Sequence, residues 1–109
     1  MTVKAVVPRS RAFRDTEKAI DNYASEAGAE IALDFVDAME ATYDRIAEHP
    51  RTGSPRYAHE LDIPGLRHRR LERYPYLVFY IERADHIDVW RVLDARSDIP
   101  AWLADPDPD

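Results

Sequence analysis

The positive charge between residues 67 and 96 is carried entirely by arginine, the side chain best suited to binding anions. A guanidinium group makes planar, paired hydrogen bonds to a phosphate or to a carboxylate. Residue type alone therefore leaves two classes of partner open, a nucleic acid and an acidic protein surface. The arginines that the sequence singles out are Arg67, Arg69, Arg70, Arg73, Arg91 and Arg96.

The charge balance favours a protein partner. The chain has 109 residues and a formal net charge of -6, whereas non-specific binding to nucleic acid depends on Lys and Arg displacing counterions from phosphates. Residues 1–49 contain six basic and ten acidic side chains, and residues 67–96 contain seven basic and five acidic ones. The segment 67–96 is therefore basic within a chain that is acidic overall.

The sequence offers few residues for metal binding, nucleophilic catalysis or proton transfer. The chain has no cysteine, which excludes disulfides, thiolate zinc sites and cysteine nucleophiles. No group of His, Asp and Glu has metal-ligand spacing, so we expect no metal and no cofactor. His68 lies between arginines, where a surface or partner contact is favoured over a proton shuttle. Tyr76 and Tyr80 alternate with apolar residues, and we expect them to pack in the core.

The pattern of apolar residues predicts one α+β domain over residues 1–104, in the order β-α-α-β-β-β. The first strand ends at Pro8, and Ser10 is predicted to cap the helix that follows. Gly28 is predicted to be the left-handed C-cap between this helix and the next. The predicted elements are a strand within 2–8, helices at 11–27 and 29–48, a turn-rich loop at 50–65, strands at 66–73, 76–82 and 86–93, and a helical turn at 101–103.

Two amphipathic helices so closely linked form an antiparallel hairpin with one apolar side, which needs a sheet to cover it. We expect that sheet to be small and mainly antiparallel. The acidic, proline-broken end at 105–109 is expected to fray. No uncharged run approaches the roughly 20 residues that span a bilayer, and the first residues do not resemble a signal peptide, so we expect a cytoplasmic protein that does not bind membranes.

Alternation along the strands places the arginines on two faces. Arg67 and Arg69 are predicted to share one face and Arg70 to lie on the other. Some of them are expected to pair with helix carboxylates such as Asp37 or Asp44. In the strand at 86–93, the alternation predicts Ile87, Val89, Arg91 and Leu93 on one face and Asp88, Trp90 and Val92 on the other.

The end of the chain leaves several alternatives open. Arg96 and Asp98 are expected to pair with each other, to cap the terminal helical turn, or to bind a partner. Trp102 lies past the last strand, where it either docks onto the sheet or anchors a partner.

Three segments carry a resemblance to a known family. They are "EHPRTGSPR", "LDIPGLRHRRLERYPYLVFYIE" and "IDVWRVLDARSDIPAWL". In this order the chain resembles the RelE/ParE toxins of type II toxin-antitoxin systems. The resemblance implies a helical hairpin on a small sheet, and a toxin that is held inactive by a cognate antitoxin in a hetero-oligomer.

The two branches of the family imply different activities. RelE-like members cut mRNA in the ribosome, whereas ParE-like members inhibit DNA gyrase. A RelE-like enzyme needs an acid, a base and cations around the phosphate, and the cations here would be Arg67, Arg70, Arg91 and Arg96. Many family members have a histidine where this chain has Asp94, and the tail "LADPDPD" lacks a tyrosine or basic residue.

We therefore expect a ParE-like inhibitor of DNA gyrase that has no catalytic residues of its own. The alternative is a ribosome-dependent mRNA interferase, and a third reading is a member that binds its antitoxin but is not toxic. Arginine suits an acidic partner segment as well as it suits phosphate. The predicted partner-binding residues are Arg67, Arg69, Arg70, Arg73, Arg96, Asp98 and Trp102.

Overall fold

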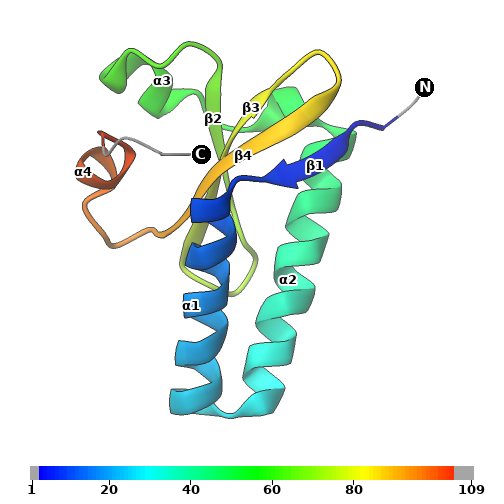
Figure 1. The fold of residues 1–109 in the computed structure, drawn as a ribbon, viewed down its shortest axis with the longest axis vertical. Helices are drawn as coiled ribbons and strands as arrows, with labels where there is room; N and C mark the ends of the chain where they lie inside the picture. The colour runs from blue at the N-terminus through cyan, green and yellow to red at the C-terminus, as the bar shows by residue number, and fades with distance from the viewer. Residues whose placement is uncertain (1–2, 105–109) are drawn as a thin grey trace.

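The computed structural model describes residues 3–104, which form a four-stranded sheet and the helices that cover it (Figure 1). The predicted tail at 105–109 lies outside the described residues. The elements are β1 (Ala5–Pro8), α1 (Ser10–Ala27), α2 (Ala29–Glu48), the 3-10 helix η1 (Pro50–Thr52), α3 (Arg56–Leu61), β2 (Leu66–Arg70), β3 (Tyr76–Glu82), β4 (His86–Asp94) and α4 (Ile99–Ala104).

The predicted fold class and element order are confirmed. The strand order in the sheet is β1-β4-β3-β2, in which β1 pairs with β4 in parallel and the other two pairs are antiparallel. The sheet is therefore mainly antiparallel, as expected. Within residues 3–104, no helix is both long enough and apolar enough to cross a membrane.

The two ends of α1 differ from their predicted caps. Ser10 is already the first helical residue, and no side-chain cap bond forms at this end. The reason is that the Arg9 amide donates to the Val89 carbonyl at 2.9 Å, so the helix begins directly after the sheet. Gly28 has φ 97° and ψ 166°, which is outside the left-handed helical region. This conformation, which favours glycine, lets one residue reverse the chain between α1 and α2.

Both faces of the sheet are buried. The hairpin of α1 and α2 packs on one face and forms the hairpin-side core, which includes Phe35, Ile46, Val78, Tyr80 and Val89. Residues from α3 and α4 pack on the other face and form the outer core. That core includes Leu66, Leu77, Phe79, Ile81, Leu93, Ile99 and Leu103. Figure 1 shows α3 and α4 on the left, away from α2. The double burial of β3 agrees with its predicted central position.

A β-bulge changes the predicted faces of β4. Phe79 pairs with Arg91 and Tyr80 pairs with Val89, so Trp90 is the additional residue in β4. A bulge reverses the alternation beyond it. Val92 therefore joins Ile87 and Val89 in the hairpin-side core, while Leu93 joins the outer core. The predicted common face of Ile87, Val89, Arg91 and Leu93 is wrong beyond Val89.

The segment at 50–65 is more ordered than the predicted loop. It contains η1 and α3, and Tyr57 and Ala58 of α3 pack against the outer core. The strand predicted at 66–73 ends at Arg70. It ends there because Leu71 and Tyr74 are drawn into the hairpin-side core, which bends the chain away from the sheet.

Candidate partner-binding surface

A cleft of about 450 Å³ lies between α2 and the end of β2, and arginines line it. Arg45 comes from α2, Arg69 and Arg70 come from β2, and Arg73 comes from the turn that follows. Two acidic side chains, Asp37 and Glu72, also line the cleft. Since four arginines and two carboxylates line the cleft, its net charge is positive, whereas the protein as a whole is negatively charged.

Arg73, which lines the cleft, has a strained backbone conformation. Its φ is 69°, in the left-handed region that non-glycine residues rarely adopt, and such strain costs roughly 1–3 kcal/mol. Its guanidinium donates to the Asp34 carboxylate at 3.2 to 3.4 Å. This exposed pair compensates by only about 0–1 kcal/mol. Strained residues of this kind cluster at functional sites, which favours a binding role for Arg73.

Asp34 also accepts a hydrogen bond of 2.6 Å from the Tyr74 hydroxyl. That bond is the main reason why the pKa of the Asp34 carboxyl is lowered, and it raises the pKa of Tyr74 to about 12. The ring of Tyr74 packs edge-on against Phe35, with ring centres 5.3 Å apart. Asp34 is therefore anchored to the core by Tyr74, and it orients Arg73 from that position.

Replacing Tyr74 with phenylalanine is expected to lower the free energy of unfolding by about 1 kcal/mol at pH 7, because a hydrogen bond to a partly exposed carboxylate is lost. The pKa of Asp34 is lower in the folded state than its usual 3.8. The bond therefore contributes fully above that value, and its contribution is lost as the pH falls through the folded pKa. Urea unfolding of both proteins at pH 7 and at pH 3 measures the difference, which should shrink in acid. A constant difference would contradict this account.

Arg67 and Arg69 hold the chain that precedes β2. Arg67 donates to the Gly53 carbonyl at 2.8 Å, and Arg69 donates to the Thr52 hydroxyl at 2.8 Å. The prediction that some of the arginines pair with a helix carboxylate is confirmed for Arg73, but its partner is neither Asp37 nor Asp44. The helix carboxylate that is used is Asp34, one turn before Asp37, because the turn at 71–75 brings Arg73 to α2 there.

Gly53 lies where Tyr80 and β2 leave no room for a side chain. The buried Tyr80 hydroxyl donates to the Pro50 carbonyl at 2.8 Å. A Cβ on Gly53 would overlap that hydroxyl and stand 3.1 Å from the His68 carbonyl oxygen. We expect Gly53→Ala to lower the free energy of unfolding by about 1–3 kcal/mol, measured by urea titration. In Gly53→Ala/Tyr80→Phe the loss should be smaller than the sum of the two single losses, and simple additivity would argue against the overlap.

Arg70 differs from the other arginines of the cleft. It pairs in register with Leu77 of the outer core, whereas Arg67 and Arg69 pair with Tyr80 and Val78 of the hairpin-side core. The predicted division of these arginines between two faces is confirmed. Arg70 forms no hydrogen bond or ion pair with any residue in 3–104, and its charge makes only a minor contribution to the lowered pKa of Asp94. Its guanidinium is therefore available to a partner.

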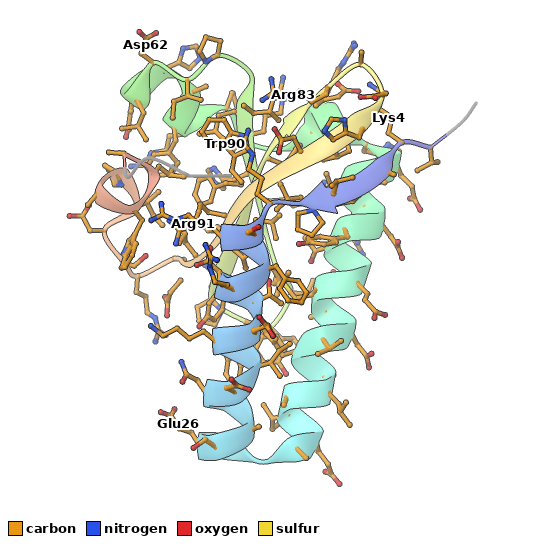
Figure 2. The ribbon with its side chains drawn as sticks, in the orientation of Figure 1. Lys4, Glu26, Asp62, Arg83, Trp90 and Arg91 are labelled. Carbon is orange, nitrogen blue, oxygen red and sulfur yellow. The ribbon has the colours of Figure 1, made fainter. Side chains whose placement is uncertain are left out.

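Arg91 is buried and belongs to an internal junction. Its guanidinium makes two hydrogen bonds of 2.8 Å to Asp15 of α1, and it donates to the Trp102 carbonyl at 3.3 Å. It also lies 5.5 Å from the centre of the Trp102 ring. Figure 2 shows Arg91 beside the start of α1, on the side of α4. A phosphate cannot reach the guanidinium of a side chain that is 10% exposed and already paired.

The structure shows the internal contacts of the residues that follow β4. Arg96 pairs with Asp94 at 2.7 Å and not with Asp98. Asp98 accepts from the Ala101 amide at 3.3 Å, which is a capping contact for α4. Trp102 docks against Arg91 but stays 46% exposed. Arg96 and Trp102 thus remain accessible, and Asp98 has a structural use.

His68 is not the surface residue that the sequence predicts. It is half-buried between Tyr57 and Phe79, with ring centres 5.5 and 5.3 Å away. Burial, with a smaller effect of Arg56, lowers its pKa, so the imidazole is neutral near pH 7. Tyr80 is fully buried and Tyr76 packs against the hairpin-side core, which confirms the prediction for both tyrosines.

Sequence reasoning missed Arg45, Asp34 and Tyr74 as parts of this surface. A signal was present, because Asp34, Ala38, Ala41 and Arg45 recur at helical spacing and share one face of α2. Small residues at the two middle positions leave room for a cleft between the charged ends. What the sequence lacks is the turn that brings Arg73 to this face.

Comparisons with known proteins agree with this fold. A family model described as "ParE toxin of type II toxin-antitoxin system, parDE" matches residues 6–99. Among solved structures, the chain is similar to a chain of "Chromosomal ParDE TA system from P. aeruginosa", with a TM-score of 0.69 and 22% sequence identity. The similarity covers 83% of this chain and 94% of that one. A search of curated proteins gave no match.

Proposed function

Since the chain belongs to the ParE family of type II toxins, we propose that it inhibits DNA gyrase and that a cognate antitoxin neutralises it. It acts in the cytoplasm by binding and catalyses no reaction of its own. The antitoxin forms a hetero-oligomer with it and covers the arginine cleft. Acidic segments of gyrase and of the antitoxin meet the same arginines in turn.

The cleft supports this proposal through its chemistry. Arg69 and Arg73 are oriented by internal contacts of 2.8 and 3.2 Å, while Arg70 is left without a partner among residues 3–104. Arginines that are already oriented lose less side-chain freedom when they bind a carboxylate. Arg45 adds a further cation, because its contact with Glu72 at 3.3 Å is exposed on both sides and so costs little to break. Arg96 and Trp102 extend the proposed contact surface beyond the cleft.

The observation that carries the choice of gyrase over mRNA is the burial of Arg91. A nuclease of the RelE type would need Arg67, Arg70, Arg91 and Arg96 around one phosphate. Here Arg91 is enclosed with Asp15, and Arg96 is paired with Asp94. These side chains therefore do not surround a single accessible position.

Expression in bacteria tests the proposal. The chain produced alone should arrest growth and induce the DNA-damage response, because gyrase trapped on cleaved DNA leaves broken chromosomes. Coexpression of the antitoxin encoded next to its gene should restore growth. Growth arrest with mRNA cut at ribosomal A sites and no DNA damage would overturn the proposal in favour of an mRNA interferase. Normal growth despite accumulation of folded protein would indicate a member that is not toxic.

A further inference from the structure

The imidazole of His68 lies between two aromatic rings, and one of its nitrogens is buried without a partner. The ring centres of Tyr57 on α3 and Phe79 on β3 are 5.5 and 5.3 Å from its own. Among residues 3–104, its Nδ1 atom finds no hydrogen-bond partner, which is uncommon for a buried polar atom. In the neutral form the proton therefore belongs on Nε2, and Nδ1 is the atom that a second proton would occupy.

The groups around His68 do not favour a positive charge. Arg56 of α3 lies 5.1 Å from the centre of the Tyr57 ring, and its charge, added to the effect of burial, lowers the pKa of His68. Its partner Glu60 is exposed and 3.3 Å away from it. On β3 the facing residue, Phe79, does not ionise. The titratable or charged side chains on this side of His68 are Arg56 and Tyr57 from α3 and, by strand alternation, Arg70 from β2.

The backbone of His68 holds the segment that precedes α3. The Ser54 amide donates to the His68 carbonyl at 2.9 Å, and the His68 amide donates to the Ser54 carbonyl at 3.0 Å. These two bonds form an isolated β-bridge. Helix α3 follows directly and has only six residues, so its stability depends on packing and not on its own length. The contacts centred on His68 therefore attach both residues 53–55 and α3 to the sheet.

We propose that His68 is an acid-sensitive contact that closes α3 on the sheet when its imidazole is neutral and lets α3 and residues 53–55 open when it is protonated. Protonation places an N–H at the buried Nδ1, where no acceptor faces it, and a charge between two rings. Attraction between a cation and the ring faces offsets only part of that cost, because the new donor stays unpaired. Opening removes the cost, since it exposes the imidazole to water.

Opening also affects the arginines of β2. Arg67 donates to the Gly53 carbonyl at 2.8 Å, and this bond is lost when residues 53–55 leave the strand. Pro50 stays in place, because its carbonyl accepts from the buried Tyr80 hydroxyl at 2.8 Å. The chain therefore bends between residues 50 and 53. Acid releases the guanidinium of Arg67 from its internal acceptor, and this expectation does not depend on the proposed function.

Hydrogen exchange of the isotope-labelled full chain, followed by NMR at pH 7.5 and pH 5, tests the proposal. Rates are expressed as protection factors, which removes the intrinsic effect of pH on exchange. The probes are the amides of Ser54, His68 and Ile63, the last of which donates to the Ala58 carbonyl at 3.0 Å. Their protection should fall several-fold in acid. The limit is about thirtyfold, for an open state in which the pKa of His68 is its ordinary 6.5 and a closed state that stays neutral. The amides of α2 should remain far better protected at both pH values, because the opening is local.

Matched variants identify the group that takes up the proton. His68→Phe keeps a ring between Tyr57 and Phe79 but cannot be protonated, and His68→Gln does the same without the bulk of a second phenyl ring. Protection of the probes should be equal at the two pH values in both variants. His59→Gln removes an exposed histidine from α3 itself, and this control should keep the pH dependence of the parent.

The parent protein alone also tests the proposal, through the NMR titration of the His68 ring, whose midpoint should lie below 6.5. A midpoint at or above 6.5, or protection of the probes that does not change between pH 7.5 and pH 5, would overturn it. So would pH dependence that survives in both His68 variants or disappears in His59→Gln. Equal protection of the probes and of α2 at pH 5 would mean that acid unfolds the whole domain, which is equally contrary.

Discussion

Asp15→Ala is expected to lower the free energy of unfolding by about 3–5 kcal/mol, because it removes the carboxylate from a buried ion pair. Asp15 and Arg91 are 17% and 10% exposed. Asp15 also accepts from the Val92 amide at 3.0 Å, next to the bulge in β4. The variant therefore leaves a buried guanidinium without its carboxylate and a strand amide without its acceptor. Domains of this size are stable by about 5–15 kcal/mol, so the loss would be large.

Urea unfolding at neutral pH measures this loss. Asp21→Ala, on an exposed position of the same helix, serves as the control and should change the stability by less than about 0.5 kcal/mol. Asp15→Ala/Arg91→Met should be less damaged than Asp15→Ala alone, because it buries no charge without its counterion. A loss of less than about 1 kcal/mol for Asp15→Ala would contradict the structural role of this pair.

Removing charge from the arginine cleft should abolish growth arrest without unfolding the protein. Arg70→Glu breaks no hydrogen bond or ion pair within residues 3–104, and it places a negative charge where the proposed partner segment is acidic. Arg73→Gly removes a cation and also relieves the left-handed backbone of Arg73, since glycine adopts this conformation without strain. The free energy of unfolding should stay within about 1 kcal/mol of the parent, because the relief of backbone strain offsets the loss of the exposed ion pair with Asp34.

The measurement is bacterial growth after induction, together with the amount of folded protein. Arg14→Glu carries the same change in charge on an exposed position of α1, and this control variant should remain as toxic as the parent. Full toxicity of Arg70→Glu and Arg73→Gly would show that the cleft is not the contact surface. An equal loss of toxicity in Arg14→Glu would show that the effect comes from net charge alone.

Local pattern was sufficient for most of the fold. The apolar residues of α1 and α2 recur at helical spacing because one face of each helix is buried, and those of β3 are consecutive because both of its faces are buried. These patterns can be seen directly in the sequence. The bulge at Trp90 was beyond such reasoning, because an extra residue is defined by pairing with another strand. Helix α3 is six residues long, too short for a periodic signal, and it is held by contact with the outer core.

The candidate site, like the fold, could be predicted only in part from the sequence. Arginine at 69, 70 and 73 was visible as a basic cluster in an acidic chain. Which arginines are structural was not visible, because Arg67 and Arg91 differ from Arg70 through partners that are distant in sequence. Asp15 is 76 residues from Arg91 and Gly53 is 14 residues from Arg67. The choice of Asp34 over Asp37 likewise depends on the turn that carries Arg73.

The most direct test of the central claim is an assay of purified DNA gyrase on supercoiled plasmid in the presence of the purified chain. We predict loss of supercoiling activity and accumulation of cleaved DNA, both reversed when the chain is first mixed with its antitoxin and both absent with Arg70→Glu. Unchanged supercoiling by gyrase, with a folded chain that cuts mRNA in the ribosomal A site, would contradict the claim.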